Sequence, residues 1–133
     1  MSKSAIYTVN TTAPTVAVNG IVPLGNTVRR FGNCIRQDGD AISLCGKGYY
    51  LVTVSVTATP SAAGTVTISA QKDGVVISGA TGSATVAAAA TAVDITITCI
   101  VRNICDCGGS LLSLVLTGAA SVVNNVAVTV EKL

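Results

Sequence analysis

The sequence predicts a single all-β domain, an antiparallel sandwich or jelly roll of about eight to ten short strands. Val, Thr, Ala and Ser dominate the chain, and β-branched side chains suit a pleated surface. Several stretches alternate apolar residues with Thr or Ser, which is the period of a strand with one buried face. Turn signals separate these stretches. The length of 133 residues fits one domain spanning 1–133.

The N-terminal stretch carries the weakest strand signals. Ile6–Val9 and Val16–Val18 are short strand candidates, and two prolines and a glycine interrupt the sequence around them. We therefore expect residues 1–24 to form an N-terminal arm that lies along the domain or on a neighbouring molecule.

Two Asp-Gly pairs predict tight hairpins, because both residues accept the positive φ angles of two-residue β-turns. Asp38-Gly39 joins a strand at 33–37 to a strand at Ala41–Leu44. Asp73-Gly74 leads into a short strand that we expect to end at Gly79.

The middle of the chain holds the clearest alternation. Val52–Ala58 places Val and Ala on one face and Thr and Ser on the other, and Pro60–Gly64 turns the chain into a return strand at Val66–Ala70. The Ala-rich run Ala84–Ala92 lacks the charged face of a surface helix, so it is interpreted as a loop. It leads into Val93–Val101, which alternates again.

The C-terminal third repeats the pattern with one exception. Cys105–Gly109 is predicted to be a turn, Gly118–Ser121 a loop, and Val126–Val130 part of the last strand. Leu111–Leu116 is apolar at nearly every position, which predicts a strand buried on both faces.

Residues for catalysis are scarce, so we predict neither an enzyme nor a bound cofactor. Histidine is absent, which removes the commonest general base and metal ligand. Asp38 and Asp40 flank Gly39, and a paired-carboxylate or calcium site is the alternative to a solvated turn there; the solvated turn is favoured because no further acid follows nearby. No glycine-rich phosphate loop is present.

The five cysteines are Cys34, Cys45, Cys99, Cys105 and Cys107. An odd number without a secretion signal favours reduced thiols in a protein made in the cytosol. Cys105 and Cys107 are weak candidates for a metal site, or for interchain disulfides in an oligomer, since their C-x-C spacing is tighter than that of common zinc sites. Unmodified turn thiols and a small core residue at Cys99 are the favoured interpretation.

The surface is expected to be poor in charge. Only 11% of residues are charged while 50% are hydrophobic, and apolar surface left uncovered typically marks a protein interface. The basic residues form no stripe, and no signal peptide or apolar helix is visible, so nucleic-acid and membrane partners are not expected. Tyr49 and Tyr50 are adjacent and point to opposite faces of a strand, one into the core and one into an interface; a sugar-stacking site is the alternative.

Gly25-Asn-Thr-Val28, then the hairpin Asp38–Leu44, then Gly48-Tyr-Tyr-Leu-Val-Thr-Val54 resemble the jelly rolls of the complement and tumour-necrosis-factor superfamily. The likeness covers about residues 25–133. It is closest to the C-terminal domains of bacterial collagen-like spore-surface glycoproteins, which also share the hairpin Gln71–Ile77 and a Val-rich end at Val126–Leu133.

The resemblance implies a ten-strand jelly roll that forms a tight homotrimer. Its interface would include Tyr49, Tyr50, Leu112, Leu114 and Leu116.

The chain begins at Met1 without the collagen repeat of the spore-surface relatives, so it looks like a small structural protein of a bacteriophage. The expectation is a capsid-decoration or head-fibre protein, made in the host cytoplasm, located in the virion and bound to the major capsid protein. A glycan- or receptor-binding module and a structural protein of a bacterial spore or cell surface are the alternatives.

Overall fold

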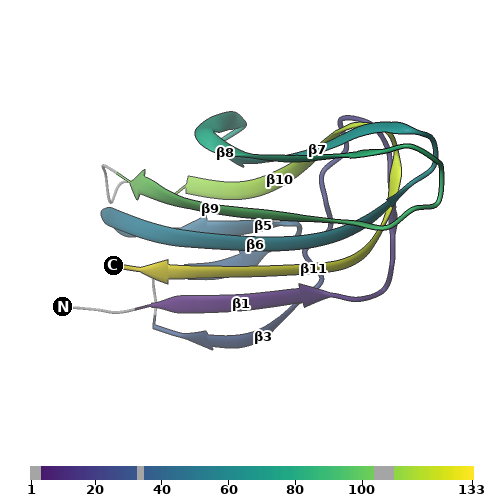
Figure 1. The fold of residues 1–133 in the computed structure, drawn as a ribbon. Helices are drawn as coiled ribbons and strands as arrows, with labels where there is room; N and C mark the ends of the chain where they lie inside the picture. Colours follow the sequence, from purple (N-terminus) through teal and green to yellow (C-terminus); the bar gives the residue numbers. More distant parts are fainter. Residues whose placement is uncertain (1–3, 33–34, 104–109) are drawn as a thin grey trace.

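The computed structural model describes residues 4–32, 35–103 and 110–133, which form two antiparallel β-sheets packed face to face (Figure 1). The strands are β1 (Ala5–Asn10), β2 (Thr15–Val16), β3 (Asn26–Phe31), β4 (Ile35–Asp38), β5 (Ala41–Leu44), β6 (Gly48–Pro60), β7 (Gly64–Lys72), β8 (Val75–Val86), β9 (Val93–Asn103), β10 (Ser110–Gly118) and β11 (Ser121–Lys132). The described residues include no helix long and apolar enough to span a membrane.

The strand order identifies a jelly roll. Sheet A has the order β3-β1-β11-β6-β9, with the short β2 paired to β11, and sheet B has the order β4-β5-β10-β7-β8. In chain order, the sheet changes between β3 and β4, β5 and β6, β6 and β7, β8 and β9, β9 and β10, and β10 and β11. The predicted fold class, an all-β antiparallel jelly-roll sandwich, is therefore confirmed, and the described residues form ten strands of four or more residues besides β2.

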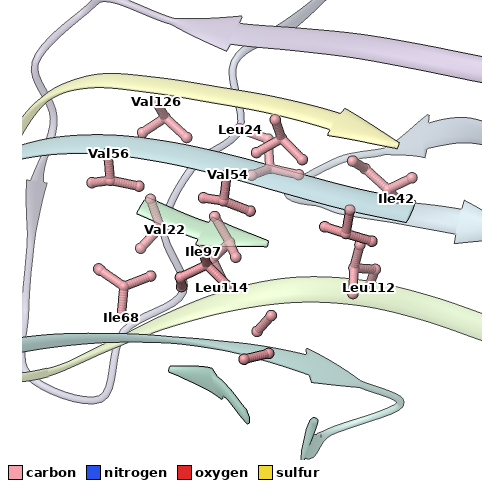
Figure 2. Packing of buried hydrophobic residues seen from close by; sticks show 14 of the residues in the cluster. Val22, Leu24, Ile42, Val54, Val56, Ile68, Ile97, Leu112, Leu114 and Val126 are labelled. Carbon is pink, nitrogen blue, oxygen red and sulfur yellow. The ribbon is translucent and has the colours of Figure 1, made fainter. Parts of the chain in front are cut away.

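The core fills the space between the sheets because each strand turns its apolar side inward. Val54 and Val56 of β6 and Val126 of β11 face Leu112 and Leu114 of β10 across this space (Figure 2). All five are buried. Fully burying one such side chain contributes about 1.5–3 kcal/mol, so the alternating pattern is itself the main source of stability.

Both predicted Asp-Gly hairpins are present. Asp73 and Gly74 have φ angles of 53° and 83°, and Lys72 pairs with Val75, which leaves the two-residue loop that the sequence indicated. Gly39 has a φ of 60° between the paired Asp38 and Ala41.

The strand after the second hairpin is longer than predicted. β8 does not end at Gly79 but continues to Val86, so only residues 87–92 of the Ala-rich run form the loop before β9. A register shift absorbs the irregularity. Gln71 of β7 pairs with Val76 and Ser69 pairs with Thr81, so the extra residues of the bulge lie in β8. Long pairing with β7 thus outweighs the local glycine signal.

Residues 4–24 form part of the domain and not a separate arm. β1 lies inside sheet A between β3 and β11, as Figure 1 shows. Ile6, Val16, Val22 and Leu24 are buried in the core. The prediction of an arm failed because buried apolar residues this widely spaced leave no periodic signal in the sequence.

Cys99 lies in β9 with its thiol half-buried against the core, close to its predicted role. Burial raises the pKa of this thiol above its ordinary value of 9.0, because the thiolate loses solvation. The folded chain therefore holds the Cys99 proton more tightly than the unfolded chain, and this contribution to stability is lost as the pH rises above 9.0.

We expect Cys99 to react several-fold more slowly with iodoacetamide at pH 8 than the exposed Cys45, since alkylation requires both thiolate and access. Peptide mapping by mass spectrometry follows the two sites separately. In urea the two rates should converge, and equal rates in the folded protein would contradict the burial of Cys99.

Gly118→Ala is expected to lower the free energy of unfolding by about 3 kcal/mol or more. Gly118 has a φ of 91°, and an added Cβ would lie 2.0 Å from the Thr65 carbonyl oxygen. Gly39→Ala is the matched control, because its Cβ would meet nothing within 4 Å and only the positive φ is penalised, by about 1 kcal/mol. Urea denaturation at one protein concentration measures both, and equal losses would refute the close approach.

Candidate self-association surface

The outer face of sheet A carries a continuous row of side chains across all five main strands. Strand register aligns Phe31, Ala5, Glu131, Leu51 and Ile100, in that order. Phe31 and Ile100 are 60% and 58% exposed, and Leu51 is half-buried. Three large apolar side chains therefore share one row with a single carboxylate.

Neighbouring rows extend this apolar region. Tyr7 is exposed on β1 one row away, where it pairs with Arg29 of β3. On the other side of the row, Tyr49 pairs with Arg102, whose guanidinium carbon lies 5.9 Å from the centre of the tyrosine ring. The Tyr49 carbonyl accepts a hydrogen bond from the Leu133 amide at 2.9 Å. One end of the sheet thus gathers exposed aromatic and aliphatic side chains.

The rest of this face is polar but largely uncharged. Thr53 of β6 lies between Thr129 of β11 and Thr98 of β9, and Ser55 lies beside Thr96 in the next row. Among the described residues, no strand or loop forms a third layer over this face. Burying a hydroxyl group costs little free energy when the group is hydrogen-bonded. Another molecule can therefore cover this face without removing many charges from water.

The two adjacent tyrosines divide between core and surface as predicted. Tyr50 is fully buried, and its hydroxyl accepts a hydrogen bond from the Gly46 amide at 3.1 Å. Tyr49 is 51% exposed on the outer face of sheet A. Tyr50 therefore stabilises the inside of one chain, and only Tyr49 is placed where a neighbouring molecule could contact it.

The predicted interface residues Leu112, Leu114 and Leu116 lie in the core instead. Each is at most 2% exposed, and Figure 2 shows Leu112 and Leu114 between the two sheets. The alternate positions Leu111 and Val115 face outward on sheet B, exposed and half-buried. The expectation that this strand is buried on both faces is wrong within the described chain, because nothing in sheet B or sheet A covers its outer side.

Sequence reasoning missed Phe31, Leu51, Ile100 and Tyr7 as surface candidates. Leu51 and Ile100 sit on the polar side of strands that otherwise alternate, between residues that point into the core. An apolar residue at a polar position of an alternating strand is the sequence signal that marks such a surface residue. Their alignment into one row depends on pairing between distant strands, which the sequence does not reveal.

The predicted alternatives for metal binding are not assembled in the described residues, which contain no group of three or more His, Cys, Asp or Glu side chains able to share an ion. Asp38 and Asp40 flank the hairpin glycine as expected. Cys105 and Cys107, the weak metal candidates, lie outside the described residues.

No protein-family model matches this chain, and no curated protein matches it in sequence. Solved structures do match it along almost its whole length. Murine APRIL at pH 8.0 gives a TM-score of 0.74 at 13% identity, covering 98% of this chain and 99% of that chain. The globular domain of the zebrafish complement 1qA protein gives 0.70 at 5% identity, covering 97% and 94%.

The vertex protein P5 of PRD1 gives a TM-score of 0.68 at 18% identity, covering 98% of this chain and 96% of that chain. At such identities the likeness is one of fold. The chain has the jelly-roll fold seen in tumour-necrosis-factor-like and complement-1q-like structures, as its sequence motifs indicated.

Proposed function

We propose that this chain is a structural protein of a bacteriophage particle, a homotrimeric jelly roll that decorates the capsid or forms part of a fibre. The observation that carries self-association is the uncovered, apolar row on the outer face of sheet A. The protein acts by packing and docking and performs no catalytic step, a view supported by a sequence without histidine.

The size of the chain and the side chains exposed on this face suit association with another copy. A stable interface typically buries about 800 Å² on each partner, a small share of the 6518 Å² that this chain exposes. Phe31, Ile100 and Tyr49 are each more than half exposed, and aromatic side chains such as Phe31 and Tyr49 are enriched in interfaces. Glu131 stands in the middle of the row, so its burial requires a basic or hydrogen-bonding partner for the carboxylate.

The proposed trimeric state is supported by the resemblance to the complement and tumour-necrosis-factor superfamily, whose jelly-roll fold this chain shares. A closed ring of three copies would cover the outer face of sheet A on every subunit at once. This agrees with the shortage of charged residues, which suits a face that is hidden from water.

The proposed location in a virion is supported by the likeness to P5, a phage vertex protein, along 98% of this chain. The protein would be made in the host cytoplasm and would attach to the major capsid protein. A structural protein of a bacterial spore or cell surface remains the alternative location.

Tyr49 favours a second candidate function, the binding of a glycan or a receptor. Its ring is exposed and could stack against a sugar. However, Arg102 already lies over the ring at 5.9 Å, so a sugar would have to displace the guanidinium or use the other face. The self-association function explains more of the exposed residues.

Ile100→Lys is expected to convert the protein from a trimer of about three times 13.2 kDa into a monomer, because three ammonium groups would be buried in the assembly. Sedimentation equilibrium at micromolar concentration measures the mass. Val76→Lys is the control, since Val76 is 50% exposed on β8 of the other sheet and its change should leave the trimer intact. If the wild-type protein is itself a monomer, the proposed trimer is wrong.

We expect mass spectrometry of purified phage particles to detect this chain in a constant ratio to the major capsid protein. Its recovery from spore coats or cell envelopes, with none in the particles, would assign it to the bacterial surface instead.

A further inference from the structure

A groove runs along β10 on the outer face of sheet B, on the opposite side of the molecule from the surface described above. Its volume is about 700 Å³, within the range of sites that hold ligands or several side chains. We name it the β10 groove, and its lining includes Ile21, Asp40, Asp73, Leu111, Ser113 and Val115.

One bank of the β10 groove is fixed by backbone hydrogen bonds to β10. The Asn19 amide donates to the Leu116 carbonyl at 2.8 Å, and the Leu116 amide donates to the Gly20 carbonyl at 3.0 Å. Ile21 pairs with Val115 in an isolated β-bridge and is 53% exposed. The backbone hydrogen bonds and the β-bridge therefore fix the apolar side chain of Ile21 at the edge of the groove.

The opposite bank is fixed by Asp73 in the hairpin between β7 and β8. The Asp73 amide donates to the Leu111 carbonyl at 2.9 Å, and the Leu111 amide donates to Asp73 Oδ1 at 2.9 Å. This pair of bonds holds the carboxylate beside Leu111, which is 42% exposed, and leaves Oδ2 for another partner.

Asp40 supplies a second carboxylate on the other side of β10. It precedes Ala41, at the start of β5, which pairs with β10 on the edge opposite to β7. Among the described residues that line the groove there are two carboxylates and neither Lys nor Arg. This is the reverse of the whole chain, whose net charge is +2.

We infer that the β10 groove binds a segment of a partner polypeptide in which a Lys or Arg side chain lies next to aliphatic side chains. The aliphatic side chains would cover Leu111, Val115 and Ile21, and the cation would lie between Asp40 and Asp73. The floor of the groove, formed by β10, alternates the apolar side chains of Leu111 and Val115 with the hydroxyl groups of Ser113 and Thr117, so it offers both apolar contact and hydrogen bonds.

The lining favours a peptide over other occupants. No aromatic ring is present among the described lining residues for a sugar to stack on, and the carboxylates repel phosphate, sulfate and acidic glycans. β10 is flanked on both edges, by β7 and by β5 with the Asn19–Val22 segment, so the partner would contact side chains and not extend the sheet.

The test uses two blocked pentapeptides, Ala-Leu-Lys-Leu-Ala and Ala-Leu-Glu-Leu-Ala, titrated into the wild-type protein and followed by amide chemical shifts. We expect the lysine peptide to shift Leu111, Ser113 and Val115, and to bind at least about fivefold more tightly than the glutamate peptide. Groove shifts from an uncharged trisaccharide but not from the lysine peptide would overturn the inference in favour of a sugar site.

Asp40→Asn with Asp73→Asn should reduce binding of the lysine peptide to the level of the glutamate peptide. Asparagine at 73 keeps an oxygen for the Leu111 amide and tolerates the φ of 53°, so the fold is retained. Asp94→Asn is the matched control on sheet A, where an oxygen still accepts from the Thr57 hydroxyl. Unchanged binding in the double variant, or no shift with either peptide, would overturn the inference.

This experiment is independent of the trimer. The sedimentation mass of the double variant should equal that of the wild type. If the protein is a monomer and still binds the lysine peptide, the proposed trimer is wrong and the inference about the β10 groove stands.

Discussion

A strand has two faces, and a two-layer sandwich has only one interior, so half of every strand must face something other than the core. In most sandwiches charged and polar side chains meet water on the outer faces. This chain has too few charges to follow that pattern. Val54 and Leu114 are buried between the two sheets, while Ile100 and Leu111 are exposed on the outer faces. The unusual composition is therefore a property of the outer faces.

The two outer faces differ in what they could meet. On sheet A, Phe31, Leu51 and Ile100 form part of a broad row that crosses five strands, which suits a wide contact with another copy. On sheet B, Leu111 lies in a groove with Asp40 and Asp73 on its banks, which suits a narrow and charged segment of a different partner. In the proposed trimer, the outer face of sheet A would be buried between copies, and the β10 groove on sheet B would bind a different partner. This division of the two faces would suit a protein that attaches to a larger particle.

The sequence was sufficient wherever the determinant is local. The alternation in Val52–Ala58 and the turn at Asp73-Gly74 depend on neighbouring residues, and both were predicted. Leu111–Leu116 was ambiguous because both of its faces are apolar, so the sequence could not say which leucines point inward. The row from Phe31 to Ile100 could not be predicted, because it is formed by the pairing register of strands that lie far apart in the sequence.

The central claim is that the outer face of sheet A is buried between copies of this chain. An electron-microscopy reconstruction of the intact assembly tests it most directly, because it shows the number of copies and the face that each presents. The account predicts three copies around one axis, with Phe31, Leu51 and Ile100 of each copy covered by a neighbour. An assembly in which these three side chains face solvent, or particles that contain single separated copies, would contradict it.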